Sequence, residues 1–359
     1  MSHFNGLTNM KLNILCLFAF ACLIVSCKTN DSYSSQFNTG DFKEIFGTPT
    51  MEEADLLNPQ NITVVDSGIL LRDYNAPYFL QYYKNHTDAE PKYFAVKGNG
   101  PDEFINTRNI YYNPIHKNLF IYDSQQKRAV YYNVHKKDIV ADEDCTHMVI
   151  LNKCDGHEMA PLKDGYVTNG VFSGKPFARL DREGNLLNTF GSFPVDSTEI
   201  TDSIAFFLLY QNMIITNPQG TRLAAASYLS DWLSFYNLDN DGNKIKEYYT
   251  FPPNVSIKQS DKYTTSVVVN DETLSTYTCL AATEKYFYAL FDGRTEKDIK
   301  DNKFEYKYVL KFNWNGDFVE GYKMKDRVSC FSVTNDDTKI LGIVYSEDGE
   351  PSIKEYKIN

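Results

Sequence analysis

One phrase recurs three times along the chain and constrains its fold more than any other feature. Segments 180–190, 238–248 and 312–322 align without gaps as LDREGNLLNTF, LDNDGNKIKEY and FNWNGDFVEGY. Each has Asp or Asn near its start, then a glycine, and an aromatic residue at its end. A type I turn followed by a residue with positive φ closes a β-hairpin in this way, and glycine adopts positive φ without steric cost. Each copy therefore predicts a strand, a tight turn and a second strand.

Further runs of aromatic and β-branched residues surround these hairpins and indicate more strands. The chain contains 26 Tyr and 24 Phe, which favour pleated, half-buried surfaces. Repeated four-stranded meanders are typical of propeller blades. The sequence thus predicts an all-β fold, a six-bladed β-propeller of four-stranded antiparallel blades. We place the six units at 57–97, 104–142, 147–191, 204–251, 267–324 and 328–359.

The last unit is one strand short, which indicates how the ring closes. An amino-terminal strand, for instance around Phe42 to Phe46, would complete the last blade. Pairing the first and last segments in one sheet removes the exposed edge that an open ring would leave. Two stacked β-sandwiches are the structural alternative, which explains the strands but not the gapless repeated hairpin.

The amino-terminal segment predicts export and a lipid anchor. From Met10, an alternative start, the sequence runs MKLNILCLFAFACLIVSC, with one cation followed by apolar and small residues. The apolar stretch is too short for a transmembrane helix and fits a signal-peptide core. Its end resembles the bacterial lipobox, in which the thiol of the cysteine, here Cys27, is acylated and becomes the new amino terminus.

We therefore divide the chain into a lipoprotein signal peptide at 1–26, a flexible tether at 27–40 and the propeller at 41–359. Acylation, for instance with palmitate, would hold the protein on the outer membrane without spanning it. In some Gram-negative lipoproteins an acidic cluster just after the cysteine directs the protein to the cell surface. Here Asp31 is the only acid close to Cys27, so the sequence does not decide between the periplasmic and the surface face.

The segment KGNGPDEF, residues 97–104, lies between two strand-like runs and reads as a corner. It contains G-x-G, but no third glycine and no G-K-[ST] follow. Pro101 lacks an N–H group, Asp102 and Glu103 would repel a phosphate, and no helix follows. A phosphate-binding loop is therefore excluded in favour of a turn.

This corner also carries a family resemblance, through Gly98, Gly100, Pro101, Glu103 and Phe104. Together with the repeated hairpin and the lipobox, it resembles the TolB-like six-bladed β-propeller lipoproteins of Gram-negative bacteria. The resemblance extends from about residue 40 to the end of the chain. It implies a six-bladed propeller in the cell envelope with no assigned reaction, and it favours binding to other macromolecules through protein contacts.

Four potential metal ligands or thiols gather in CTHMVILNKCDGH, residues 145–157. Cys145, His147, Cys154 and His157 could form a tetrahedral zinc site, but their spacing matches no zinc finger and a strand separates the pairs. In an oxidising compartment a disulfide between Cys145 and Cys154 is the stronger alternative, and free thiols stay open as well. Two further cysteines, Cys279 and Cys330, lie in strand runs and are expected to be small core residues.

The second repeated hairpin invites a calcium interpretation. Asn237, Asp239 and Asp241 fall at the first, third and fifth positions of a calcium loop, but Tyr248 stands where a bidentate Glu belongs. The sister hairpins carry Arg or Lys at the first position, so this hairpin forms elsewhere without a metal. We keep Asp239 and Asp241 as weak calcium ligands and expect no other cofactor.

Charge and motifs limit the function. The net charge of −11 and the lack of a basic stripe exclude nucleic-acid binding. Arg72, Arg108 and Arg294 flank strand runs and could lie at a channel rim, or on a solvated surface.

No nucleophile or metal motif is recognisable, so we expect a non-catalytic envelope protein whose propeller binds a protein or glycan partner. The alternative is a propeller hydrolase, of lactonase or glycosidase type, that uses channel acids with or without a metal. A third is a purely architectural lipoprotein.

Overall fold

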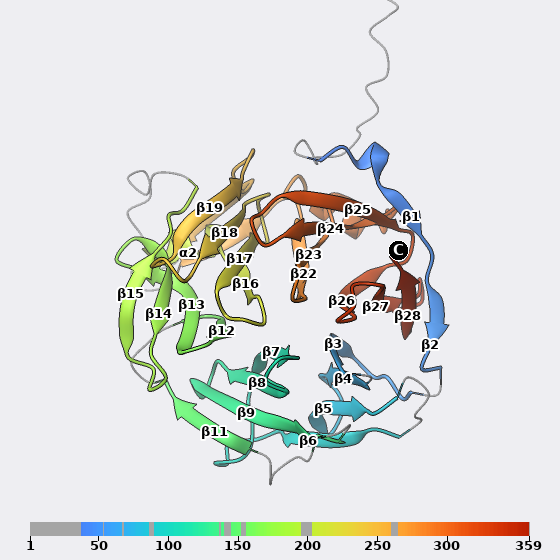
Figure 1. The fold of residues 1–359 in the computed structure, drawn as a ribbon. Coiled ribbons are helices and arrows are strands. Elements are labelled where there is room, and N and C mark those ends of the chain that lie inside the picture. Colours follow the sequence, from blue (N-terminus) through green and yellow to red (C-terminus); the bar gives the residue numbers. More distant parts are fainter. Residues whose placement is uncertain are drawn as a thin grey trace, which may run out of the picture. The chain divides into compact units, whose positions relative to one another are not determined.

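The computed structural model describes residues 37–358, except for 53, 67, 86–89, 136–137, 140–144, 152–155, 195–202 and 260–264. Within this part of the chain, six sheets of mainly antiparallel strands form a closed ring around a central axis (Figure 1). None of the helices in the described ranges is long and apolar enough to cross a membrane. The predicted six-bladed propeller is therefore confirmed.

The first three blades follow one another along the chain, each running from the axis outward. Blade 1 consists of β3 (Pro59–Val65), β4 (Gly68–Asp73), β5 (Tyr78–Tyr83) and β6 (Lys92–Val96). Blade 2 consists of β7 (Thr107–Asn113), β8 (Asn118–Asp123), β9 (Arg128–His135) and two strands that both pair with β9, namely β10 (Asp138–Ile139) and β11 (Cys145–Ile150). Blade 3 consists of β12 (Met159–Leu162), β13 (Gly165–Phe172), β14 (Lys175–Leu180) and β15 (Leu186–Phe190).

The remaining blades repeat the same order. Blade 4 consists of β16 (Asn212–Thr216), β17 (Arg222–Ser227), β18 (Leu233–Asn237) and β19 (Asn243–Tyr248). Blade 5 consists of β22 (Tyr277–Ala282), β23 (Tyr286–Phe291), β24 (Lys307–Asn313) and β25 (Phe318–Met324). Blade 6 contains β26 (Val328–Val333), β27 (Lys339–Tyr345) and β28 (Pro351–Lys357). Connections between blades hold α2 (Ser203–Leu209) and the hairpin of β20 (Val255–Gln259) and β21 (Thr265–Val269), while α3 (Glu296–Lys300) follows β23.

The amino-terminal segment closes the ring, as expected, but it does so with two strands that join different blades. After a short 3-10 turn, η1 (Thr39–Asp41), β1 (Lys43–Ile45) pairs in parallel with β25 of blade 5, and β2 (Thr48–Thr50) pairs antiparallel with β28 of blade 6. In Figure 1 the blue amino-terminal strands lie beside the red carboxy-terminal ones. The fourth strand of blade 6 is thus β2, a few residues after the expected position.

Two blade boundaries differ from the sequence-based ones. The strand at Cys145–Ile150, expected to open blade 3, is the outer strand of blade 2, because β10 covers only the end of β9 and leaves the rest of that edge available. Blade 5 begins at Tyr277 rather than near residue 267, because β21 pairs with β20 in a hairpin of its own.

The core lies between the blades, because each sheet is covered on both faces. In β17, Ala224 and Ala226 pack toward blade 5, in a cluster with Phe287, while Ala225 packs toward blade 3, in a cluster with Phe177. All three alanines are fully buried. Residues that alternate along a strand point to opposite faces, so a strand buried on both sides reads as a continuous apolar run.

The three repeated hairpins form as predicted. Their glycines, Gly184, Gly242 and Gly316, adopt φ values of 79°, 79° and 80°. Each also lies against the preceding blade: a Cβ on Gly184 would come within 2.2 Å of Leu151 Cδ2. A side chain at these turns would meet both backbone strain and a neighbouring blade.

Candidate functional site

A cavity of about 340 Å³ lies on the propeller axis. It is lined mainly by the inner strands of the blades, β3, β7, β12, β16, β22 and β26, and by residues at their ends. Arg72 of β4 and Tyr228, which follows β17, complete the lining. Residues from all six blades therefore line one cavity.

Neutral polar groups dominate the lining. Among the described residues around the cavity, Glu158 is the single acid and Arg72 the single base. Tyr111, Tyr112 and Tyr228 supply aromatic surface. The other polar members are amides and hydroxyls: Gln60, Asn61, Thr63, Asn109, Asn113, Thr216, Asn217, Thr278, Ser329, Ser332 and Asn335.

Neighbouring inner strands are joined by what we call the inner-strand belt, in which a side chain of one blade accepts a hydrogen bond from a backbone N–H of another. An inner strand is the edge of its sheet, so one row of its N–H groups lacks a strand partner. Four bonds make up the belt: Met159 N to Asn109 Oδ1 at 3.0 Å, Ile214 N to Glu158 Oε2 at 3.1 Å, Phe331 N to Cys279 Sγ at 3.4 Å, and Val64 N to Ser332 Oγ at 3.0 Å.

Glu158 has the most specific surroundings in the cavity. Its side chain is 4% exposed, and Oε1 accepts a hydrogen bond from the Tyr228 hydroxyl at 3.1 Å. Its backbone N–H donates to Asn169 Oδ1 at 2.7 Å, which orients the residue at the start of β12. Nearby, burial and the charge of Glu158 raise the pKa of Tyr111, whose hydroxyl donates to the Ile214 carbonyl at 2.6 Å. The site is therefore a carboxylate held among neutral hydrogen-bonding groups.

The three arginines named from the sequence have different places. Arg72 lines the cavity, where its guanidinium donates to the Thr107 carbonyl at 2.7 Å and to Gln60 Oε1 at 3.1 Å, joining blades 1 and 2. Arg294 forms an ion pair with buried Asp292, at 2.6 Å, instead of lining the cavity. Arg108 lies in β7, with its side chain outside the described part.

The corner at 97–104 is a hydrogen-bonded turn. Gly98 N donates to the Phe104 carbonyl at 2.9 Å, and Gly100 N donates to Glu103 Oε2 at 2.8 Å. The Arg128 guanidinium of blade 2 lies 4.6 Å from the centre of the Phe104 ring and donates to the Pro101 and Glu103 carbonyls. The turn thereby ties blade 1 to blade 2, and the strand β7 follows it.

At the hairpin with the calcium-like spacing, Arg222 contacts two of the residues considered as calcium ligands, Asn237 and Asp239. Arg222 Nη1 donates to Asn237 Oδ1 at 2.9 Å and pairs with Asp239 Oδ2 at 3.3 Å. Asp241 takes a positive φ of 55° in the turn. Among the described residues, no three His, Cys, Asp or Glu side chains gather as a metal site would require. Cys27 and Cys154 lie outside the described residues, as does the Cys145 side chain.

Sequence reasoning did not single out Asn109, Glu158 or Tyr228. The available signal was positional: Asn109 lies near the start of β7, Glu158 directly precedes β12, and Tyr228 directly follows β17. Without the inner strand of each blade assigned, that signal could not be separated from ordinary turn residues.

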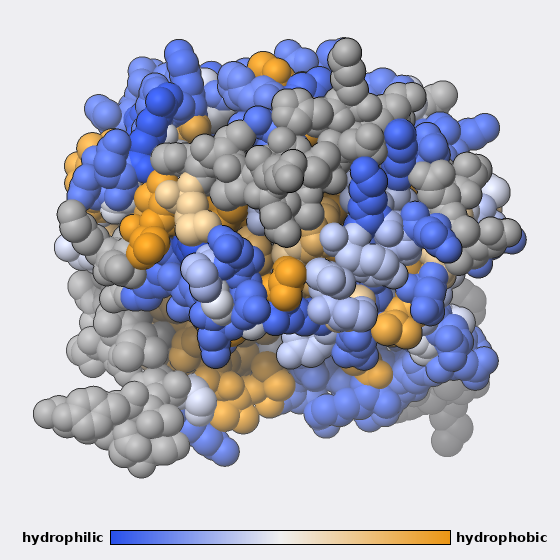
Figure 2. Space-filling model, turned by 90° about the horizontal axis from the view of Figure 1, so that it is seen from below, coloured by the Kyte–Doolittle hydropathy of each residue, from blue (hydrophilic) through white to orange (hydrophobic). Residues whose placement is uncertain are grey.

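The outer surface carries both hydrophilic and exposed hydrophobic side chains. On the face shown in Figure 2, hydrophilic side chains predominate and hydrophobic ones form smaller groups. The large exposed apolar residues come from several blades, for example Tyr93, Ile115 and Ile150.

Comparisons with known proteins agree with this architecture. No protein of curated function matches the chain in sequence. Among solved structures, one similar protein comes from Bacteroides fragilis and is named as an exported protein. It shares 14% identity with this chain at a TM-score of 0.52, and the match covers 90% of this chain and 98% of the other.

A member of the DUF4221 family from Bacteroides vulgatus is similar as well, with 8% identity and a TM-score of 0.51 over 88% of this chain and 96% of its own. At these identities the likeness shows the fold alone. The profile of the family described as TolB-like 6-blade propeller-like matches residues 42–336. The chain therefore belongs to the TolB-like six-bladed propeller family.

Proposed function

We propose that the protein is a lipid-anchored binding protein of the cell envelope, and that its axial cavity binds a neutral, hydroxyl-rich ligand such as a glycan. The observation that carries the proposal is the lining of the cavity, in which amides, hydroxyls and tyrosines surround one acid and one base.

The envelope location rests on the amino-terminal segment. Cys27 follows an apolar signal-like stretch and a lipobox-like tripeptide. A structurally similar protein carries the name of an exported protein, which agrees with export of this chain. An acylated Cys27 on the outer membrane, followed by a polar segment, would leave the propeller free to meet its ligand.

A glycan fits the cavity better than a charged ligand. Amide and hydroxyl groups both donate and accept, which matches the hydroxyls of a sugar, and tyrosine rings offer faces for its apolar C–H groups. The volume of about 340 Å³ is at the lower end of small-molecule pockets, so it suits one or two sugar residues of a longer chain.

Binding is better supported than hydrolysis. Most glycosidases flank the scissile bond with two carboxylates. Around the described cavity wall a single carboxylate is present, and Glu158 already accepts hydrogen bonds from Tyr228 and Ile214.

The test is equilibrium binding of the purified protein to a panel of neutral and acidic oligosaccharides, measured by calorimetry. Tyr228→Phe removes one cavity hydroxyl and should weaken binding about tenfold, the cost of about one hydrogen bond. Tyr74→Phe is the matched control, because Tyr74 is exposed and outside the lining. The proposal of a glycan ligand would be rejected if no glycan bound and if crosslinking in the envelope captured a protein instead.

The anchor is tested separately. Cys27→Ala should abolish incorporation of a labelled fatty acid and release the protein from the membrane fraction. Retention of both label and membrane association in this variant would contradict the proposed anchor.

A further inference from the structure

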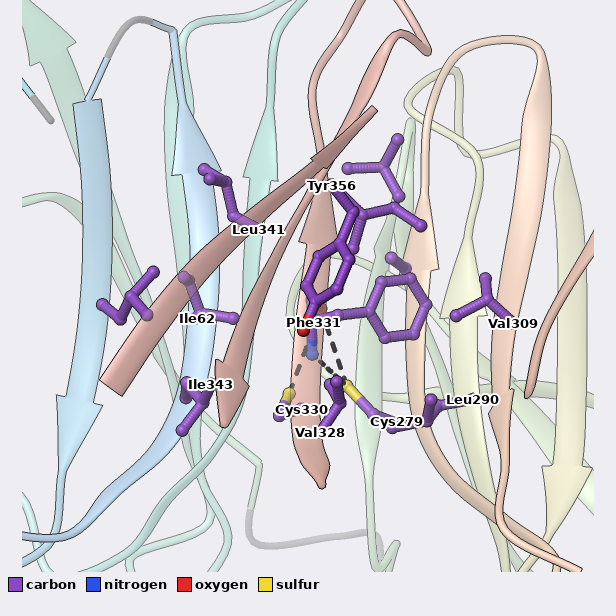
Figure 3. Packing of buried hydrophobic residues seen from close by; sticks show 14 of the residues in the cluster. Ile62, Cys279, Leu290, Val309, Val328, Cys330, Phe331, Leu341, Ile343 and Tyr356 are labelled. Atoms are coloured by element: carbon purple, nitrogen blue, oxygen red, sulfur yellow. Dashed lines mark hydrogen bonds between the residues drawn. The ribbon is translucent and has the colours of Figure 1, made fainter. Parts of the chain in front are cut away.

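Two cysteines meet where blade 5 adjoins blade 6. Cys279 is the third residue of β22 and Cys330 the third residue of β26, so they occupy equivalent positions in neighbouring inner strands. Both line the axial cavity and both are 6% exposed. Figure 3 shows the two sulfur atoms close to the backbone of Phe331, with dashed lines to both.

Both sulfurs contact the backbone of the same residue, Phe331. Phe331 N, the peptide nitrogen that follows Cys330, donates to Cys279 Sγ at 3.4 Å. Both thiols also approach the Phe331 carbonyl, at 3.6 Å from Cys279 and 4.0 Å from Cys330. The influence of each thiol on the other lowers the pKa of Cys330 and raises that of Cys279.

Hydrogen bonding alone explains these cysteines poorly. At the other three joints of the inner-strand belt, the acceptor is an oxygen, from Asn109, Glu158 or Ser332. Sulfur is a weak acceptor, so a serine would perform the same task better than Cys279 does. What a pair of cysteines adds at one joint is the ability to form a covalent bond.

We propose that Cys279 and Cys330 form a disulfide that joins blade 5 to blade 6 beside the closure of the ring. The cross-link closes a loop of about 50 residues, and it restricts the unfolded chain more than the folded one. The proposal rests on the export proposed above, because disulfides persist in oxidising compartments.

The oxidant is a disulfide, such as that of a thiol–disulfide oxidoreductase or of glutathione. The Cys330 thiolate attacks one sulfur of that disulfide and releases the other as a thiolate, which leaves a mixed disulfide on Cys330. Cys279 then loses its proton and attacks Cys330 Sγ, and the remaining oxidant thiolate departs. The two cysteines are oxidised by two electrons, and the oxidant disulfide is reduced to two thiols.

The test uses the folded full-length protein, reduced and then incubated with glutathione disulfide. Free thiols are alkylated under denaturing conditions, and the digest is examined by mass spectrometry. A peptide linking Cys279 to Cys330 should account for most of both residues and vanish after reduction. Glutathione adducts or alkylated thiols at both positions without this peptide would overturn the proposal. This assay does not depend on export, which fractionation of cells tests by itself.

Thermal unfolding provides a second readout. The oxidised protein should melt several degrees above the reduced one, and Cys279→Ser should lose that difference. Serine keeps an acceptor for Phe331 N, so the variant retains the belt. The Cys145→Ser/Cys154→Ser variant is the matched control and should keep the difference. A difference that follows Cys145 and Cys154 instead would count against the proposal.

Discussion

The aromatic ring of Phe190 lies against Gly242: a Cβ added to Gly242 would come 2.3 Å from two atoms of that side chain. Phe190 ends the first copy of the repeated hairpin and Gly242 is the glycine of the second. The next pair repeats the relationship, because the Tyr248 hydroxyl donates to the Gly316 carbonyl at 2.8 Å. The closing aromatic of one hairpin thus contacts the glycine of the next, which links successive blades.

Gly242→Ala should therefore destabilise the protein by about 2–4 kcal/mol. Part of the loss is the strain of a non-glycine residue at positive φ, and part is the collision with Phe190. Gly174→Ala is the matched control, since Gly174 has a φ of 80° with nothing within 4 Å of its added Cβ. It should cost only about 1–2 kcal/mol. Urea unfolding of both variants measures the two terms, and equal losses would show that the contact with Phe190 contributes nothing.

Phe42→Ala should cost about 3–5 kcal/mol, because the ring is buried over Gly321 and stacks on Phe318 at 5.8 Å. The loss falls on β1, the parallel strand beside blade 5. Phe46, four positions later, is 70% exposed, so Phe46→Ala should change the free energy of unfolding by less than about 0.5 kcal/mol. Similar effects of the two substitutions in urea unfolding would contradict the packing of the amino-terminal segment.

Asp292 should make stability depend on pH in the acid range. Burial alone would raise its pKa, but the hydrogen bonds and charges of Arg294 and Lys307 hold it below 3.8. A carboxyl whose pKa is lower in the folded state stabilises the protein above its unfolded pKa, and this contribution is lost as the pH falls through the folded value.

Asp292→Asn leaves two cations without their carboxylate, so at neutral pH it should cost about 3–5 kcal/mol. The difference from the wild type should shrink as the pH falls below 3.8, where the wild type also loses its charge. Unfolding curves across that range check the sign, and a difference independent of pH would refute the assignment.

Glu158→Ala should destabilise the protein by about 2–4 kcal/mol, because it leaves the Ile214 N–H and the Tyr228 hydroxyl without this acceptor in a buried site. Glu158→Gln keeps one acceptor oxygen and should lose less than half as much. Chemical unfolding of both variants measures how much the Glu158–Ile214 hydrogen bond of the belt stabilises the joint of blades 3 and 4. Equal losses would show that the charge, rather than the hydrogen bond, is what the joint requires.

Local signals predicted the parts of the fold that depend on neighbours in sequence. The hairpins at Gly184, Gly242 and Gly316 follow from turn chemistry. The number of blades follows from the six strand-rich units counted along the chain. The strand missing from the last unit correctly indicated closure by the amino terminus. The error at Cys145–Ile150 has a tertiary cause, because either neighbouring blade could have accepted that strand and the available edge of β9 decided.

The sequence by itself determined the repeated hairpin and the propeller class, because turn geometry and strand periodicity act over a few residues. Its apolar amino-terminal segment predicts export. Only the tertiary structure decided which polar residues meet at the axis. Asn109, Glu158 and Cys279 come from three different blades, and they converge because every blade turns its inner strand toward the same cavity. Their partners are backbone N–H groups, which have no sequence signature, so the inner-strand belt becomes visible only when the ring is closed.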